Sequence, residues 1–277
     1  MPFDEWIGRS EVVEDLITSW PVAALQAVFD LDRPIPRPGD PIPPMWHWLF
    51  FLSTTRRSQL GPDGHAVRGG FLPPVDLPRR MFAGGRTEFL APVRVGQTAR
   101  RTGTVVRIEE KEGRRGPLVF VTARFEVSTE DGVAIVEEQD LVYREAAAGS
   151  QQPPPGSDPV PEAMWAETIT PDPVMLFRFS ALTFNSHRIH YDYPYVTETE
   201  GYPGLIVHGP MTAMWLIGLC TANDPRPVSR FSFRGRSPLF CDGPVGLRGG
   251  IGDGGSAGLS AWSHDLRLAM TAEVEFG

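Results

Sequence analysis

The sequence has little cysteine, no long hydrophobic run and no excess of positive charge. Only Cys220 and Cys241 occur in 277 residues, without the spacing of metal ligands, so we expect two reduced thiols and no metal site. No hydrophobic run approaches the roughly 20 residues that a membrane-spanning helix needs. Residues 1–15 are acidic, whereas a signal peptide is basic and then apolar. We therefore expect a cytoplasmic protein with no membrane partner.

The composition indicates a globular protein rich in loops and strands. Hydrophobic residues make up 41% of the chain and charged residues 22%. Proline, with 28 residues, occurs at about twice its usual share, which favours a largely β structure over a helical bundle. The net charge of −8 argues against a nucleic-acid partner, although arginine clusters can still bind a smaller anion.

The N-terminal half is predicted to contain helices followed by strands. Ser10 is a candidate helix cap, so we expect a helix to Trp20 and another from Pro21 to about Asp30. Residues 118–127 alternate apolar and polar side chains, the period of a strand with one buried face, and residues 102–110 and 133–143 do likewise. These segments predict a meander of three strands or more.

An aromatic run and a polar segment interrupt this pattern. The run from Trp46 to Phe51 is predicted either to fill the core or to form the wall of an acyl pocket. Residues 146–160 are mainly Ala, Gly, Ser, Gln and Pro, a composition typical of a linker. We therefore predict an N-terminal unit at 1–145, a linker at 146–160 and a C-terminal unit at 161–277.

The C-terminal half is predicted to surround one apolar helix with strands. Residues 175–181 are predicted to be a strand or extended segment, and four alternating segments end at Phe276. The helix expected from Pro210 to about Thr221 has no polar face and should be buried on all sides. A curved antiparallel sheet wrapped around this helix satisfies both patterns. The order of elements suggests that the N-terminal half is a second copy.

One loop concentrates the proton carriers. Asn185, His187, His190 and Asp192 precede Gly209 and Pro210, which open the apolar helix. Such groups beside a helix start suit acid/base chemistry on a carbonyl compound.

Several sequence blocks resemble a known family. Residues 178–192 and 204–210, with blocks at 60–65, 69–74 and 77–89, resemble the MaoC-like double hot-dog (R)-type enoyl-thioester hydratases and dehydratases. The most similar branch contains itaconyl-CoA and mesaconyl-CoA hydratases and mitochondrial-type hydroxyacyl-thioester dehydratases. The resemblance covers most of the chain and implies an α+β fold of two hot-dog units, each a curved antiparallel sheet wrapped around a long helix.

The family motif assigns candidate catalytic residues. Its His and final Asp fall on His190 and Asp192, and its His-Gly pair falls on His208 and Gly209. The catalytic Asp of the wider family falls on Asn185, a departure that is expected in this branch and that removes one of two proton carriers.

The chemistry of these side chains suggests a role for each. We expect His190 to carry the proton, Asn185 to hold the attacking water, and the N–H of Gly209 to stabilise an enolate oxygen. Gly209 could instead merely begin a helix. Asp192 is expected to orient either the loop or His190, with His208 in support.

Arginines are the candidates for binding the anionic parts of a substrate. Arg86, flanked by Gly84, Gly85 and Glu88, is the first choice for an acyl carboxylate, and Arg188 could pair with a carboxylate or face solvent or phosphate. The others are Arg79, Arg80, Arg230, Arg234 and Arg236.

The resemblance implies an acyl-CoA hydratase acting on a short branched dicarboxyl thioester, itaconyl-CoA or mesaconyl-CoA, to give a hydroxyacyl-CoA such as citramalyl-CoA. A dehydratase of fatty-acid synthesis, a hot-dog thioesterase and a non-catalytic acyl-CoA-binding module are the alternatives. No cofactor is expected beyond the coenzyme A of the substrate. We expect a homo-oligomer, with a dimer as the first choice.

Overall fold

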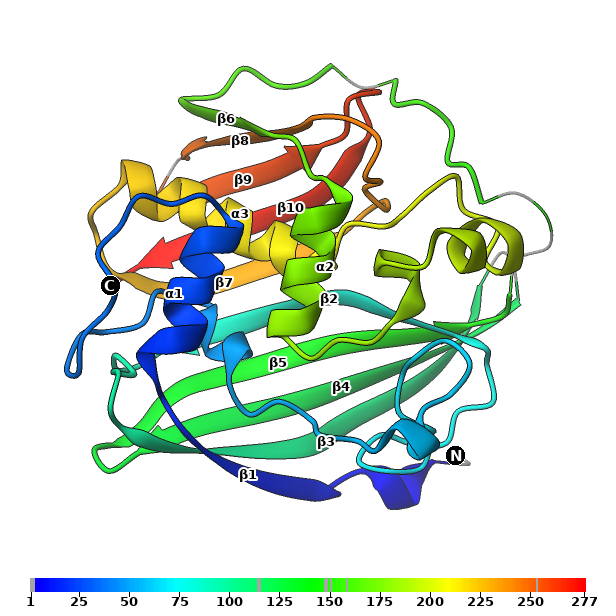
Figure 1. Ribbon diagram of the computed structural model, residues 1–277, viewed down its shortest axis with the longest axis horizontal. Coiled ribbons are helices and arrows are strands. Elements are labelled where there is room, and N and C mark those ends of the chain that lie inside the picture. Colours follow the sequence, from blue (N-terminus) through cyan, green and yellow to red (C-terminus); the bar gives the residue numbers. More distant parts are fainter. Residues whose placement is uncertain (1–2, 114–115, 147–148, 150, 158, 253) are drawn as a thin grey trace.

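A computed structural model shows one continuous antiparallel sheet with helices packed on it (Figure 1). It describes residues 3–113, 116–146, 149, 151–157, 159–252 and 254–277. None of the helices in these residues is long and apolar enough to cross a membrane.

Ten strands form the described sheet, and their order repeats in the two halves. From one edge to the other the order is β1-β3-β4-β5-β2-β7-β10-β9-β8-β6, so each half has the same internal order and the halves meet at β2 and β7. This repetition confirms the double hot-dog architecture. The strands are β1 (Ser10–Leu16), β2 (Arg79–Phe89), β3 (Thr98–Gly113), β4 (Gly116–Thr129), β5 (Gly132–Arg144), β6 (Trp165–Ile169), β7 (Val228–Gly235), β8 (Val245–Ile251), β9 (Ala257–Trp262) and β10 (Leu268–Phe276).

Close backbone approach at the junction depends on a glycine. Gly84 of β2 pairs with Arg234 of β7, and a Cβ atom at this position would lie 2.4 Å from the carbonyl oxygen of Phe233. A side chain here would therefore push the two halves apart.

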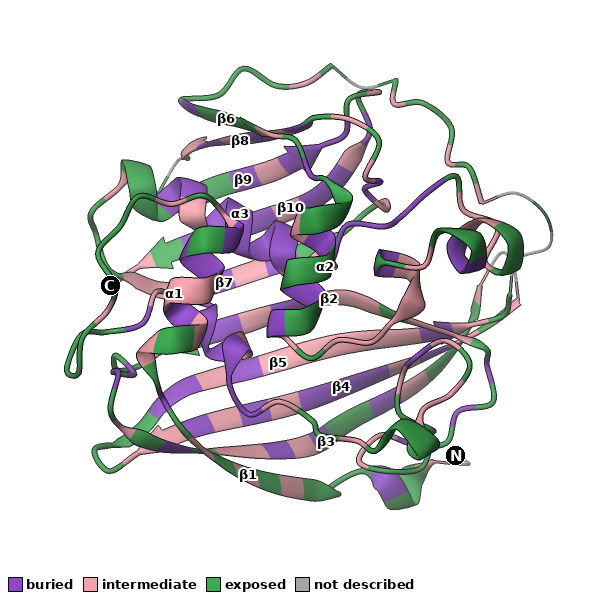
Figure 2. Ribbon diagram, in the orientation of Figure 1, coloured by how far each residue is buried: buried purple, intermediate pink, exposed green. Residues whose placement is uncertain are grey.

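The described residues contain three α-helices: α1 (Ser19–Val28), α2 (Pro173–Leu182) and α3 (Gly209–Asn223). Helix α3 packs against β6–β10, and most of it is buried, as the apolar sequence predicted (Figure 2). Helices α1 and α2, one from each half, contact each other.

Two predicted elements are wrong. Residues from Ser10 form β1 rather than a helix, because they pair with β3 from Thr104 to Thr98. The segment predicted as a strand at 175–181 belongs to α2. Its start is fixed by Asp172, whose Oδ1 accepts the N–H of Met175 at 2.7 Å, and by Pro173 in the first turn.

The first half departs from the predicted symmetry in one respect. Its described residues contain no helix of the length of α3. The α-helix α1 has 10 residues, and only the short 3₁₀ turns Trp46–Leu49 and Arg57–Gln59 occur between it and β2. The prediction of a long helix in each unit is therefore corrected, and residues of the irregular segment 29–78 help to form the cavity described next.

Candidate active site

A cavity of about 700 Å³ lies between segments of both halves. Trp48, Phe50 and Phe51 line it, whereas Trp46 and Leu49 of the same aromatic run are buried in the core. Phe50 and Phe51 also belong to the buried core, so the core prediction for this run is confirmed, and the wall of an acyl pocket stays a prediction. The acids, amides and imidazoles that line the cavity are Asp63, His65, Gln139, Asn185, His187, His190 and Glu200.

His190 is held as a neutral base. It ends the 3₁₀ turn Arg188–His190, and its side chain is 7% exposed. Its Nδ1 donates to the carbonyl oxygen of Ile206 at 2.7 Å, which leaves the lone pair of Nε2 available. Burial lowers the pKa of His190 to about 4, against the opposing effect of the Ile206 hydrogen bond. The imidazole can therefore accept a proton at neutral pH.

His208 supports His190 from behind. The two rings stack with centroids 3.7 Å apart, and His208 is fully buried. Its Nε2 and the hydroxyl of Ser180 on α2 lie 2.8 Å apart. Desolvation lowers the pKa of His208 well below its ordinary value, so this ring is a neutral packing partner.

Gly209 offers a backbone donor to the cavity. It is the first residue of α3 and lines the cavity, and within the described chain its N–H has no hydrogen-bond partner. The following Pro210 has no N–H to compete, and the helix dipole favours negative charge at this point. This end of α3 can stabilise an oxyanion.

Asn185 lines the cavity beside these groups. Its Oδ1 accepts the N–H of His187 at 3.0 Å, so the carbonyl end of the amide is used within the loop. The NH₂ end is left to donate to a water or substrate oxygen.

Asp192 orients the loop and not His190. Its Oδ2 accepts from Nε of Arg188 at 2.9 Å, and its Oδ1 accepts the N–H of Tyr195 at 3.1 Å. Arg188 also donates to the carbonyl oxygen of Pro62 at 3.0 Å and does not line the cavity. The predicted substrate contact of Arg188 is corrected, because its guanidinium joins two loops.

The arginine first expected to bind a carboxylate lies outside this cavity. Arg86 and Arg234 line a separate hollow, and Arg86 pairs with Glu138 and, at 2.9 Å, with Asp140. A β-bulge between Phe82 and Gly84 breaks the alternation that would place Arg80 and Arg86 on one face, so Arg80 lines the cavity and Arg86 does not. The arginines that do line the cavity are Arg79, Arg80, Arg101 and Arg236, while Arg230 does not.

Three of these cavity arginines differ in their partners. Arg79 forms an ion pair with Glu200. Arg101 was not predicted as a site residue. Its Nη2 lies 3.8 Å from Oε1 of Glu11, and burial lowers the pKa of the Arg101 guanidinium. For Arg80 the described chain supplies no carboxylate partner within ion-pair distance.

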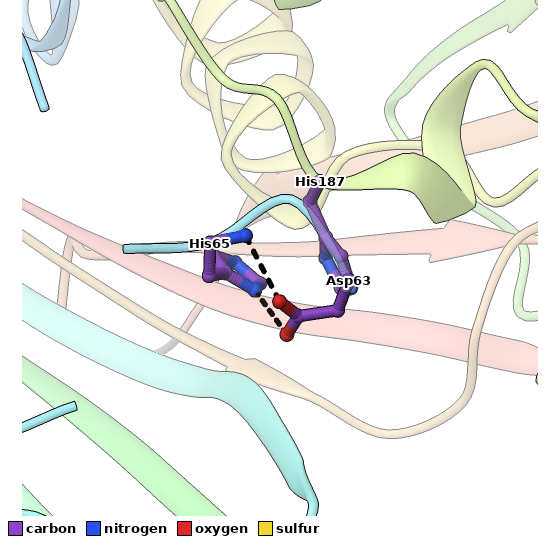
Figure 3. Close-up of side chains that lie close together, drawn as sticks. All are labelled: Asp63, His65 and His187. Atoms are coloured by element: carbon purple, nitrogen blue, oxygen red, sulfur yellow. Dashed lines mark hydrogen bonds and ion pairs between the residues drawn. The ribbon is translucent and has the colours of Figure 1, made fainter. Parts of the chain in front are cut away.

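The sequence also gave no role to the pair Asp63 and His65, which meets His187 in the cavity (Figure 3). The rings of His65 and His187 lie 4.0 Å apart. The Asp-Gly-His order was the only signal, and the sequence does not show which loop it meets.

Comparisons with known proteins agree with this structure. The model of the family "Hydroxyacyl-thioester dehydratase type 2" matches residues 45–241. A mesaconyl-C(4)-CoA hydratase of Chloroflexus aurantiacus is 47% identical over 272 residues, which cover 98% of this chain and 97% of that protein. The mitochondrial hydroxyacyl-thioester dehydratase type 2 of Schizosaccharomyces pombe is 25% identical over 92% of this chain and 94% of its own length.

Solved structures show the same fold. HtdX of Mycobacterium tuberculosis has a TM-score of 0.66 at 23% identity, covering 97% of this chain and 100% of its own. Another protein of that organism, described as a double hot-dog fold, has a TM-score of 0.54 at 15% identity, covering 97% and 95%. With the family match and the 47% relative, these findings show that the chain belongs to the hydroxyacyl-thioester dehydratase type 2 family of MaoC-like double hot-dog proteins.

Proposed function

We propose that this protein is an acyl-CoA hydratase that adds water reversibly to mesaconyl-C(4)-CoA, giving a hydroxyacyl-CoA of the citramalyl-CoA type. The observation that supports this reaction class is that His190, with a free Nε2, and Gly209, with a free N–H, line the same cavity. The substrate is supported by the relative of 47% identity.

The reaction follows from these two groups. A thioester oxygen beside the N–H of Gly209 gains a hydrogen bond as the enolate forms. Nε2 of His190 accepts the proton of the attacking water, while the NH₂ of Asn185 holds its oxygen. The new bond joins the water oxygen to Cβ, and a proton then reaches Cα.

Arg80 is our choice for the substrate carboxylate. In mesaconyl-C(4)-CoA the carboxylate is attached to Cβ, so its binding group must lie near the proton carriers. Arg80 lines the cavity, and its charge contributes to the lowered pKa of His65 and His187, whose largest cause is burial. The exposed Arg236, whose Nε lies 3.4 Å from the hydroxyl of Thr271, is assigned to the phosphates of coenzyme A.

Two other substrates define the alternatives. Itaconyl-CoA carries the same carboxylate on an isomeric chain. A hydroxyacyl-thioester of fatty-acid synthesis is favoured by the family description and the yeast relative. We further propose that the enzyme works in the cytoplasm as a homodimer and without a cofactor.

The test is a substrate panel with the purified chain. Hydration of mesaconyl-C(4)-CoA, itaconyl-CoA, crotonyl-CoA and a crotonyl carrier-protein thioester should be followed by mass spectrometry of the products, with a thiol assay for hydrolysis. We expect the highest kcat/KM for mesaconyl-C(4)-CoA and no free thiol. A preference for the unbranched substrates would favour the dehydratase, thiol release a thioesterase, and stabilisation by ligand without turnover a binding module. Sedimentation equilibrium tests the dimer.

A further inference from the structure

The loop 61–65 of the first half docks onto the catalytic loop of the second. The N–H of Arg188 donates to the carbonyl oxygen of Asp63 at 2.9 Å, and the hydroxyl of Ser186 donates to the carbonyl oxygen of Gly64. Gly64 has a φ of +90°, and a Cβ atom on it would lie 1.8 Å from the carbonyl oxygen of Ser186. The absence of a side chain therefore lets the two loops touch.

Asp63 fixes the imidazole of His65. Its Oδ2 lies 2.9 Å from Nδ1 of His65, and its Oδ1 accepts the backbone N–H of His65 at 3.0 Å. Burial would raise the pKa of Asp63, but the hydrogen bonds and charge of His65 outweigh it and keep the pKa low. An ionised carboxylate can only accept, so Nδ1 carries a proton towards Asp63 and Nε2 of His65 is the nitrogen left to exchange one.

A continuous row of imidazoles joins His65 to His190. His187 lies 4.0 Å from the ring of His65 and 5.5 Å from that of His190, measured between centroids. All three rings line the cavity (Figure 3 shows the first contact). Asp63 is the carboxylate bonded to this row, whereas the motif position at 185 holds an amide.

We propose that His65, oriented by Asp63, is the second proton carrier of the active site and replaces the carboxyl group that Asn185 lacks. This inference rests on the proposed hydratase function. His65 is the catalytic residue, and Asp63 is a positioning residue.

One proton circulates in the proposed step. In the reacting form for hydration His65 is an imidazolium with a proton on Nε2, which the hydrogen bond to Asp63 favours and burial opposes, and His190 is neutral. Water forms its bond to Cβ while its proton moves to Nε2 of His190, and Cα takes the proton from Nε2 of His65. His187, in contact with both rings, returns the proton from His190 to His65. Dehydration reverses each transfer.

Asp63, His65 and His187 could instead bind a metal ion, since their donor atoms lie within 4.8 Å of one another. Both carboxylate oxygens of Asp63 are, however, already hydrogen-bonded to His65. This arrangement favours proton transfer by His65 over metal binding. Treatment of the enzyme with a chelator distinguishes the two roles.

The main test compares His65→Gln with the wild-type enzyme on mesaconyl-C(4)-CoA. Gln can still donate to Asp63 but cannot carry a proton, so we expect kcat to fall by about 100- to 10,000-fold with KM changed little. The control is His264→Gln, because His264 forms a surface pair with Asp242 at 3.5 Å outside the cavity. The control should keep wild-type kinetics, and both variants should keep the wild-type melting temperature.

Asp63→Asn tests the positioning role through the pH profile. The charged and titratable groups around His65 are Asp63, His187, His190, Arg68 and Arg80. Removing the carboxylate disfavours the imidazolium, so the alkaline limb of kcat for hydration should move to lower pH. An unchanged profile would overturn the role of Asp63.

Three results separate the possible failures. An active wild-type enzyme with a fully active His65→Gln variant would overturn this inference alone. Activity lost on treatment with EDTA and restored by zinc would overturn it in favour of a metal. A wild-type enzyme with no hydratase activity would remove the proposed function itself.

Discussion

The imidazole rings of His190 and His208 lie 3.7 Å apart with an angle of 19° between their planes. Each ring has its own anchor, the carbonyl oxygen of Ile206 for His190 and the hydroxyl of Ser180 for His208. Burial lowers the pKa of both, and a charge on His190 would further disfavour one on His208. The stack therefore favours a neutral imidazole at His190, as its proposed role as a base requires.

Stability should fall in mild acid. The folded-state pKa of His190, about 4, lies below the ordinary 6.5, so the unfolded chain binds more protons between these values. At 1.36 kcal/mol per pKa unit, His190 alone loses about 3 kcal/mol of stability as pH falls through this window. Urea unfolding at pH 7.5 and 5 measures it, and His190→Ala should reduce the difference. Equal free energies of unfolding at both pH values would contradict the buried neutral imidazole.

Arg80→Met should impair binding of the carboxylated substrate selectively. A lost hydrogen bond between charged groups costs about 1.5–3 kcal/mol, so we expect KM for mesaconyl-C(4)-CoA to rise by roughly 10- to 150-fold and that for crotonyl-CoA to rise little. The matched control is Arg86→Met on the same strand, which faces the other hollow. Equal losses on both substrates would assign Arg80 to coenzyme A or to folding.

Gly64→Ala should separate the two loops of the site. The new methyl group would overlap the carbonyl oxygen of Ser186, next to Asn185. A displacement of about 1 Å can reduce catalysis about 100-fold, and we expect a loss of kcat of that order. Gly70→Ala is the control, since a Cβ atom there has no neighbour within 4 Å. Wild-type kcat in Gly64→Ala would show that the docked loop is dispensable.

Residues 161–277 expressed alone should be insoluble or self-associated. Without the first half, β7 loses its partner β2, and α2 loses the cover of α1. Light scattering after gel filtration measures the state of the fragment. A monomer that unfolds cooperatively would show that the C-terminal unit does not need the other.

The predictable parts of the fold were those with a complete local pattern. Strand β4 alternates apolar and polar side chains from Val121 to Val127, and α3 is apolar on all sides, so both were predicted. Strand β1 was missed because its pairing with β3 is distant in sequence.

The site was predicted less completely for the same reason. His190, Asn185 and Gly209 belong to one motif and line one cavity. Asp63 and His65 reach that cavity only through the packing of the two halves. Arg86 was misplaced because the sequence does not reveal the bulge in β2.

In the proposed mechanism His190 carries the proton during hydration of a CoA thioester. The most direct measurement is kcat for mesaconyl-C(4)-CoA in the wild-type enzyme, His190→Ala and Asn185→Ala, with circular dichroism as the check on folding. We expect His190→Ala to lose about 100- to 10,000-fold and Asn185→Ala, which loses one neutral hydrogen bond, roughly 2- to 13-fold. A folded His190→Ala variant with wild-type kcat would contradict the account.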